Sequence, residues 1–474
     1  MRHNGAMTSA TISGVRTTGI YCRADCTASP LARNVTLYPS SIAAEAHGFR
    51  PCLRCRPDRL PPFSADGETI VARGLRMISD GALDAYTEVD LAQRLATSER
   101  HLRRLFLSEL GATPDFIARS RRAHFARRLL DETDLSMPVV AAAAGFRSVR
   151  QMNRMIIETF RFTPTVLRAK RGKNDRMAAD GGLRLRLPFA GAPAFDSTLA
   201  YLASRAIPGV EAVDAGTYRR SVVMCGYPGV IEVAQGDASH LHVTVHLAAL
   251  TSLIDAVARI RRIAGLDQPG DASELLKRDS MLRPLIARRP GLRVPGAWDP
   301  FEVAVRIIVG QQISVRGAST ITGRIAQCFG EGVGGVGGWG LTHTFPSARR
   351  IAGVRVDQLR ETGLTQSRAE SVRAFARVYA EGKVPLDGSH TLEDLVGALT
   401  SLPGIGPWSA QMIAMRAASS VDAFPAGDLG LRKAAATLLQ REDVPGAEEL
   451  AERAEAWRPH RGVAAMYLWS SLAH

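Results

Sequence analysis

The sequence predicts a multidomain, mainly α-helical chain in which two small α+β domains accompany two helical domains. The chain has 474 residues, which is too long for a single hydrophobic core. Four of its six cysteines lie within residues 22–55, as in a small domain held together by a metal. Beyond them, helical patterns of apolar residues are interrupted once by alternating residues, which are typical of strands.

Changes in composition along the chain predict four domains. The first ends in the proline-rich stretch RPDRLPPF, and the polar stretch AKRGKNDRMAADGG separates the second from the third. The third contains the strand patterns LRLRLPF, YRRSVVMCGY, VIEVAQG and HLHVTVHL, and helical patterns resume near Leu250. The glycine-rich stretch FGEGVGGVGGWG is interpreted as a flexible loop. The expected domains are residues 1–62, 68–170, 183–264 and 271–474.

The net charge of +14 is concentrated in two windows of the second domain. Residues 94–128 hold nine arginines against three acidic residues, and residues 145–173 hold eight basic residues against one acidic residue. A positive charge this concentrated favours a polyanion, and counterion release would drive binding to double-stranded DNA. A solvated basic helix face is the alternative interpretation.

Other features exclude a membrane or secreted protein. No apolar run approaches the length of a membrane span, and the N-terminus lacks the apolar segment of a secretory signal. The few, clustered cysteines do not resemble a disulfide framework, so a cytoplasmic protein associated with the nucleoid is expected. Nothing in the sequence indicates an obligate dimer.

The four clustered cysteines have the spacing of a metal site. Cys22 and Cys26 form a CxxxC pair, and Cys52 and Cys55 form a CxxC pair after a gap of 25 residues. This spacing is suitable for one tetrahedral Zn²⁺ ion bound by four thiolates. The spacing alone leaves two interpretations open, because a zinc ion could simply hold together a segment too small to fold unaided.

The stretches VRTTGIYCRADC and NVTLYPSSIAAEAHGFRPCLRCRPD resemble the N-terminal domain of the bacterial Ada family. The resemblance implies that Cys22 accepts a methyl group from a DNA phosphotriester, with Cys26, Cys52 and Cys55 as the other ligands. A zinc ion with four thiolates has a net charge of −2, and methylation of one thiolate reduces it to −1. Repulsion between the site and DNA phosphates would therefore fall after methyl transfer.

The basic region contains two helix-turn-helix patterns, VDLAQRLATSERHLRRLF and SMPVVAAAAGFRSVRQMNRMIIETFRFTP. With the final FRFTPTVLR, they resemble the paired unit of AraC-type regulators, in which the second helix of each unit enters the major groove. Transcription activation is therefore implied, with RNA polymerase as a further partner. Each of these arginines could contact a DNA phosphate instead of reading a base edge, and both interpretations stay open. The candidate DNA contacts are Arg100, Arg103, Arg147, Arg150 and Arg154.

Near the C-terminus, TSLPGIGPWSAQMIAMRA joins two helices through a turn that contains Gly404 and Gly406. Glycines allow close backbone approach, so amide groups at the start of the second helix could bind a DNA phosphate. An ordinary helix cap is the alternative. About twenty residues later, Asp428 begins another helix, where capping alone could also explain an aspartate.

Together with WDPFEVAVRIIVGQQIS and EAWRPHRGVAAMYLW, these motifs resemble the helix-hairpin-helix DNA glycosylases of the AlkA type, from about Leu183 to the C-terminus. The resemblance implies that Asp428 is the catalytic carboxylate, which stabilises the sugar cation as an alkylated purine leaves. It also implies a base pocket and a DNA-binding surface. The pocket residues are Trp408, Trp469, Tyr201, Met412 and Leu429, and Ser409 and Gln312 join the hairpin glycines in binding DNA.

Two absences refine this expectation. Glycosylases that also cleave the DNA backbone have a Schiff-base lysine where this chain has Trp408, so base release without lyase activity is expected. No cysteine follows Cys328, so no iron–sulfur cluster is expected.

The sequence therefore predicts a DNA alkylation-damage protein with two activities. The C-terminal half would excise alkylated purines of the 3-methyladenine type by hydrolysis, and the N-terminal half would transfer methyl groups to Cys22 and activate transcription. The alternative is a DNA-binding transcription regulator with a structural zinc ion and an inactive glycosylase-like domain.

Overall fold

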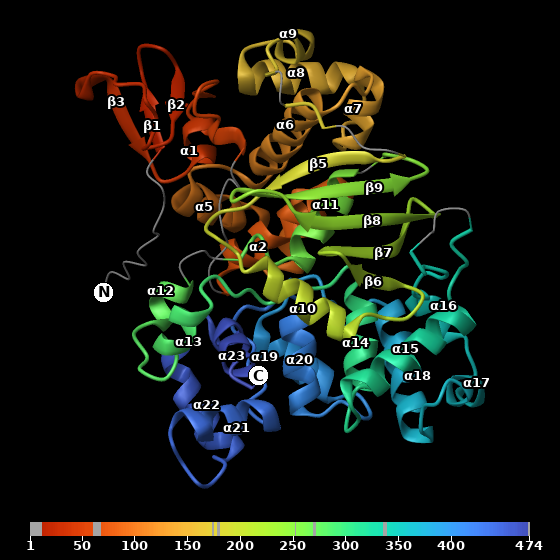
Figure 1. Ribbon diagram of the computed structural model, residues 1–474. Helices are drawn as coiled ribbons and strands as arrows, with labels where there is room; N and C mark the ends of the chain where they lie inside the picture. The colour runs from red at the N-terminus through yellow and green to blue at the C-terminus, as the bar shows by residue number, and fades with distance from the viewer. Residues whose placement is uncertain are drawn as a thin grey trace. The chain divides into compact units, whose positions relative to one another are not determined.

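The computed structural model describes residues 12–59, 68–172, 175–177, 181–251, 253–268, 272–334 and 339–472. The chain forms two compact units (Figure 1). The first unit comprises Met1–Ala65, Ile70–Ala178 and Leu250–Ala256, and the second comprises Asp66–Thr69, Ala179–Ala249 and Val257–His474.

The first unit begins with a small four-stranded sheet of order β3-β1-β2-β4. β2 pairs in parallel with β4, whereas β1 pairs antiparallel with both β2 and β3. Ile12, Tyr21 and Ala44 form its small buried core. This core is too small to hold the segment together alone, as the clustered cysteines indicated. The elements are β1 Ile12–Val15, β2 Ile20–Cys22, β3 Val35–Tyr38, α1 Ser41–Ala46 and β4 Arg50–Pro51, with short 3₁₀ turns at Ala32–Asn34 and Pro57–Arg59.

The rest of this unit is helical. Five of its helices begin at a serine or threonine whose hydroxyl accepts a hydrogen bond from the first-turn backbone, which explains why the helices start where they do. The long helix α6 separates two helix-turn-helix pairs, α4–α5 and α7–α8. The bounds are α2 Ile70–Ser79, α3 Ala82–Ala85, α4 Glu88–Arg94, α5 Glu99–Leu110, α6 Pro114–Glu132, α7 Met137–Ala143, α8 Val149–Phe160 and α9 Pro164–Ala169.

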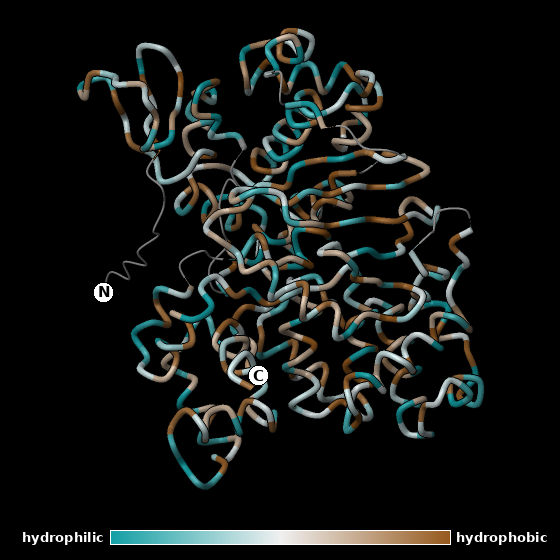
Figure 2. Tube along the Cα trace, in the orientation of Figure 1, coloured by the Kyte–Doolittle hydropathy of each residue, from teal (hydrophilic) through white to brown (hydrophobic). Residues whose placement is uncertain are grey.

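The second unit contains a five-stranded antiparallel sheet of order β5-β9-β8-β7-β6. Hydrophobic stretches mark its central strands in Figure 2. Val230, Ile231 and Val243, which belong to β8 and β9, are buried. The four predicted strand patterns correspond to β5, β7, β8 and β9, whereas β6 was not predicted. β6 has four residues and pairs only with β7, so it is too short to show an alternating pattern. The strands are β5 Leu183–Pro188, β6 Glu211–Asp214, β7 Thr217–Met224, β8 Tyr227–Gln235 and β9 His240–Leu247.

The helical part of the second unit has a continuous core that includes Phe301, Phe375 and Trp457. No helix in the described ranges is long and apolar enough to cross a membrane. The helices whose bounds the structure gives are α10 Phe195–Arg205, α11 Leu253–Ile263, α12 Ala272–Leu276, α13 Arg283–Arg288, α14 Pro300–Val309, α15 Val315–Phe329, α16 Ala348–Ala352, α17 Val356–Glu361, α18 Gln366–Ala380, α19 Leu392–Thr400, α20 Pro407–Arg416, α21 Leu429–Leu438, α22 Ala447–Ala454 and α23 Arg461–Ser470, with a 3₁₀ turn at Glu455–Trp457.

Candidate functional site

The four clustered cysteines converge in the first unit. Their Sγ atoms all lie within 4.8 Å of one another. The pairing of β2 with β4 brings the two halves together, because the Cys52 amide donates to the Tyr21 carbonyl oxygen at 3.0 Å. Cys22 and Cys52 are buried, and Cys26 and Cys55 are half-buried.

These residues fit a zinc ion. Four thiolates at about 2.3 Å from a common centre would have sulfur atoms as closely grouped as these. Burial and the neighbouring Cys52 raise the pKa of the Cys22 thiol well above its usual range, and a cation bound by the four sulfur atoms would favour the thiolate form. The four-sulfur donor set is the one that zinc accepts in structural sites.

A buried hydrogen-bond network, which the sequence did not predict, connects this site to α6. Glu45 on α1 accepts hydrogen bonds from Tyr21 at 2.6 Å and from Ser120 at 2.7 Å, and its carboxylate lies 2.6 Å from His124 Nε2. Burial would lower the pKa of His124, but the Glu45 carboxylate outweighs burial and raises it. Tyr21 directly precedes Cys22, so the network holds the cysteine-bearing strand against the helix between the two helix-turn-helix pairs.

A second connection runs from the CxxC loop. Arg56, which follows Cys55, donates to Asp58 at 2.9 Å and to Asp131 on α6 at 2.6 Å. Burial would raise the pKa of Asp58, but the Arg56 guanidinium holds it below its usual value. The structure therefore brings metal-site loops and helix-turn-helix elements together in one compact unit.

The five arginines predicted to contact DNA are all exposed. Arg100 and Arg103 lie on α5, Arg147 precedes α8, and Arg150 and Arg154 lie on α8, so they belong to the second helix of each pair or to the turn before it. Arg103 forms ion pairs with Glu88 and Glu99, and Arg154 lies 3.8 Å from Glu158. Phosphate contacts by the two paired residues would have to compete with these carboxylates.

In the second unit, the predicted hairpin joins α19 to α20. Gly404 has φ +76°, and a Cβ there would lie 2.0 Å from Ser371 Oγ, so this position requires glycine. A Cβ on Gly406 would meet nothing within 4 Å, which leaves its face of the turn open. The backbone amides at the start of α20 are therefore accessible to a partner on this side.

Gln311, which was not predicted from the sequence, stabilises this hairpin through two hydrogen bonds. Its Nε2 donates to the Gly404 carbonyl oxygen and to Ser409 Oγ, both at 2.8 Å. Ser409, which was expected to bind DNA, is buried, and its hydroxyl oxygen accepts this hydrogen bond. The adjacent Gln312, also expected to bind DNA, is exposed and has φ +57°, in the left-handed region.

Asp428 lies between two indoles. Its Oδ2 accepts a hydrogen bond from Trp408 Nε1 at 2.9 Å, and its Oδ1 accepts from Trp469 Nε1 at 2.9 Å. Oδ1 also accepts from the Leu431 amide at 3.0 Å, so Asp428 caps α21 as well. Three N–H donors from α20, α21 and α23 thus fix the carboxylate. The expected pocket aromatics therefore contact the expected catalytic group directly.

The other expected pocket residues, Met412, Leu429 and Tyr201, lie on α20, α21 and α10. Met412 is half-buried one helical turn after Trp408, and Leu429 is 54% exposed at the first position of α21. Two guanidinium groups pack against the ring of Tyr201 on α10. The guanidinium carbon of Arg205 lies 4.0 Å from the ring centroid, and that of Arg416 lies 4.1 Å from it. Burial would raise the pKa of Tyr201, but the charges of Arg416 and Arg205 lower it.

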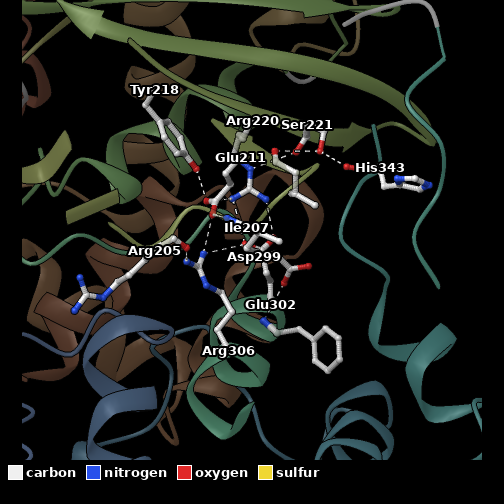
Figure 3. Close-up of polar contacts among 12 residues, drawn as sticks. Arg205, Ile207, Glu211, Tyr218, Arg220, Ser221, Asp299, Glu302, Arg306 and His343 are labelled. Atoms are coloured by element: carbon white, nitrogen blue, oxygen red, sulfur yellow. Dashed lines mark hydrogen bonds and ion pairs between the residues drawn. The ribbon is translucent and has the colours of Figure 1, made fainter. Parts of the chain in front are cut away.

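A buried ion cluster positions α10 relative to α14 (Figure 3). Arg220 Nη2 lies 2.7 Å from Glu302 Oε2, and Arg306 Nη1 lies 3.1 Å from Glu211 Oε2. Arg306 also donates to the carbonyl oxygen of Arg205 at the end of α10. No local sequence pattern identifies this cluster, because its members come from β6, β7 and α14.

Comparisons with known proteins agree with this arrangement. Family models match in four segments: the metal binding domain of Ada at residues 2–58, a helix-turn-helix domain at 91–170, the AlkA N-terminal domain at 184–299, and the HhH-GPD superfamily of base excision DNA repair proteins at 305–459. The chain is 37% identical over 470 residues, 98% of this chain and 93% of the relative, to a probable bifunctional transcriptional activator/DNA repair enzyme AlkA of Mycobacterium tuberculosis. The chain belongs to this Ada/AlkA family.

Other relatives match the halves of this Ada/AlkA chain separately. DNA-3-methyladenine glycosylase 2 of Escherichia coli is 31% identical over 275 residues, 57% of this chain and 91% of the relative. The E. coli bifunctional transcriptional activator/DNA repair enzyme Ada is 35% identical over 155 residues, 32% of this chain and 42% of the relative. A solved 3-methyladenine DNA-glycosylase from Archaeoglobus fulgidus covers 60% of this chain and 97% of its own, with 26% identity and a TM-score of 0.54.

The predicted resemblance and fold class are thereby confirmed. This Ada/AlkA protein combines zinc-binding, helix-turn-helix, antiparallel-sheet and helix-hairpin-helix glycosylase domains, and its partner is DNA. The boundaries of the four domains and the roles of individual residues stay predictions.

Proposed function

We propose that the second unit hydrolyses the N-glycosidic bond of alkylated purines of the 3-methyladenine type and leaves an abasic site. The observation that carries this proposal is the carboxylate of Asp428, held by the indole N–H groups of Trp408 and Trp469. An alkylated purine already carries positive charge, so it leaves as a neutral base when the bond to the sugar breaks. Asp428 would then stabilise the developing sugar cation, and water would add to the sugar carbon.

DNA binding would place the damaged nucleotide next to this carboxylate. Backbone amides at the start of α20, exposed beside Gly406, would hold a DNA phosphate. A base flipped out of the duplex would enter between Trp408, Met412 and Tyr201. Trp408 occupies the position of the lysine in glycosylases with lyase activity, so we expect base release without backbone cleavage.

The first unit would accept a methyl group from a DNA phosphotriester on Cys22. The Cys22 sulfur would form a bond to the methyl carbon, and the carbon–oxygen bond would break to leave a phosphodiester anion. Zinc, when bound by the four cysteines, keeps the sulfur in its nucleophilic thiolate form. The helix-turn-helix pairs, connected to this site through Glu45 and Arg56, would bind promoter DNA and bring RNA polymerase to repair genes.

Asp428→Asn tests the glycosylase proposal. The native chain and the variant are incubated with methylated duplex DNA, and abasic sites are counted before and after mild alkali. We expect the variant to release bases at least about a hundredfold more slowly, because the asparagine side chain has no negative charge. Asp443→Asn is the matched control, since Asp443 is exposed and pairs with Arg441 outside the site. Equal release by native chain and Asp428→Asn would contradict the mechanism.

Intact-mass measurement after incubation with methylated DNA tests the acceptor. We expect a gain of one methyl group on native chain and none on Cys22→Ser, whereas Cys225→Ser, which changes an exposed cysteine elsewhere, should gain it. If native chain gains no methyl group, the zinc site is purely structural. The protein would then be a regulator fused to a glycosylase, or, if Asp428 also proves unimportant, a DNA-binding regulator alone.

A further inference from the structure

Two histidines of β9, which lies between β5 and β8 (Figure 1), face each other at one end of the five-stranded sheet. His240 and His242 are two residues apart on this strand, so their side chains lie on the same face of the sheet. Their Nε2 atoms are 3.3 Å apart, and their ring centroids are 5.1 Å apart. Both residues are half-buried, and Asp237 and Ser239 in the preceding turn are exposed, so this end of the sheet is open to solvent.

The carboxylate of Asp237 orients the first of these imidazoles. Asp237 Oδ1 lies 2.7 Å from His240 Nδ1, and Ser239 Oγ lies 3.3 Å from the same nitrogen. The Ser239 amide donates to this carboxylate oxygen at 2.7 Å and holds it in place. A carboxylate only accepts hydrogen bonds, so the neutral ring of His240 carries its proton on Nδ1 and has a free lone pair on Nε2. Histidines that bind metals usually donate their other ring N–H to a carboxylate in this way.

A glycine makes room for both rings. A Cβ on Gly236 would lie 2.9 Å from Cδ2 of His240 and 3.1 Å from Cδ2 of His242. It would also lie 2.5 Å from the carbonyl oxygen of His240. Because Cδ2 is bonded to Nε2, a side chain at this position would press on the same edge of each ring that carries the facing nitrogen. Glycine at position 236 therefore allows the two Nε2 atoms to converge.

The distance between the two nitrogens matches that between two ligands of a tetrahedral zinc ion. With Zn–N bonds of about 2.0–2.1 Å, two ligands at the tetrahedral angle are about 3.3 Å apart. Ligands at the right angles of square-planar or octahedral sites would be about 2.9 Å apart. A hydrogen bond donated by His242 Nε2 to His240 Nε2 is the alternative interpretation of this contact.

We infer that His240 and His242 form a second, open zinc site, separate from the four cysteines. The Zn²⁺ ion would be bound by both Nε2 atoms, His242 would carry its proton on Nδ1, and water would occupy the remaining positions. The neighbouring charges act in opposite directions, because Asp237 attracts the cation, whereas Arg184 and Arg186 on the paired strand β5 repel it. The site should therefore exchange zinc with the solution, whereas the closed four-sulfur site should retain it.

Equilibrium dialysis of the full chain tests this inference. Chain whose cysteines already hold zinc is dialysed against rising concentrations of free Zn²⁺, and we expect uptake of a further ion. His240→Gln and His242→Gln each remove one ligand and should abolish this uptake. Asp237→Asn should weaken it by about tenfold, because the carboxylate that orients His240 is lost. His390→Gln, which changes an exposed histidine outside the sheet, should retain the uptake.

Gly236→Ala separates geometry from residue type, because it keeps both histidines but places a Cβ against their rings. This variant should bind the further ion more weakly than the native chain does. Thermal unfolding gives a second readout, since a ligand that binds only the folded state raises the melting temperature. Free zinc should raise the melting temperature of the native chain and of His390→Gln, but not that of His242→Gln.

The proposed base release and methyl transfer do not enter these measurements, so their failure would leave the zinc site unaffected. No further uptake by the native chain would overturn the inference and would leave the two rings as a hydrogen-bonded pair. Uptake by both His240→Gln and His242→Gln as strong as that of the native chain would overturn it as well, since the ion would then lie elsewhere.

Discussion

The indole nitrogen of Trp408 donates a hydrogen bond to Oδ2 of Asp428 at 2.9 Å. Trp469 makes the equivalent contact with Oδ1, so each carboxylate oxygen receives one indole N–H. An aromatic residue expected only to stack on a base therefore also holds the carboxylate that we propose acts on the sugar. Trp408 therefore has two expected roles, stacking on a base and positioning Asp428, and a substitution can separate them.

Trp408→Phe keeps an aromatic ring but removes the N–H donor. We expect base release to slow by roughly tenfold to a hundredfold, because a hydrogen bond to a charged group contributes about 1.5–3 kcal/mol. Affinity for undamaged duplex DNA should be unchanged. Single-turnover release from methylated DNA measures the rate, with Trp339→Phe on an exposed loop as the control. A rate within twofold of native would show that the contact does not position Asp428.

The two hairpin glycines should respond differently to alanine. Gly404→Ala forces a Cβ against Ser371 at a positive φ, so we expect the second unit to lose roughly 1–3 kcal/mol of unfolding free energy. Gly406→Ala meets no protein atom and should leave stability unchanged, but it should weaken DNA binding, since its methyl group would stand where a phosphate approaches. Urea unfolding and fluorescence anisotropy with duplex DNA measure the two effects.

Gly397→Ala is the control for this pair, because it lies within α19 and its Cβ would also meet nothing. It should be neutral or slightly stabilising, with unchanged DNA affinity. If Gly406→Ala binds DNA as tightly as Gly397→Ala, the phosphate does not lie at this turn.

The Glu45 network should make the stability of the first unit depend on pH. Because Glu45 raises the pKa of His124 in the folded state, the protonated pair stabilises the fold. This contribution is fully present below the unfolded histidine pKa of about 6.5 and is lost as the pH rises through the folded value. Denaturant unfolding is measured between about pH 6 and pH 9, in steps of about one pH unit. The free energy of unfolding should fall as the pH rises in the native chain, and this fall should be absent in His124→Gln. An identical decline in this variant would assign the effect elsewhere.

Metal removal should affect the two units separately. We expect one zinc ion per chain, released by a strong chelator, with loss of folded structure in the small sheet that the cysteines hold. Abasic-site formation should persist, since Asp428 and both indoles belong to the other unit. Metal analysis, circular dichroism and the abasic-site assay follow the three effects. Loss of base release after chelation would contradict this separation.

Much of the fold was predictable because its signals are local. Alternating apolar residues predicted four of the five strands in the second unit, and the helix-capping residues Ser98 and Ser148 precede α5 and α8. β6 was not predicted because a strand of four residues is too short to show a clear alternation of apolar and polar residues. Contacts such as those of Gln311 with Gly404 and Ser409 could not be predicted, since the partners lie more than ninety residues apart.

The sequence by itself indicated the family. The cysteine cluster, the two basic helix-turn-helix patterns and the glycine hairpin followed by Asp428 are short-range features, and the resemblance to the Ada and AlkA families depends on them. Only the tertiary structure decided which groups meet: both indoles on Asp428, and Glu45 between the cysteine-bearing strand and α6. The reason is that hydrogen bonding and burial depend on distance in space, and chain folding brings these residues together from separate elements.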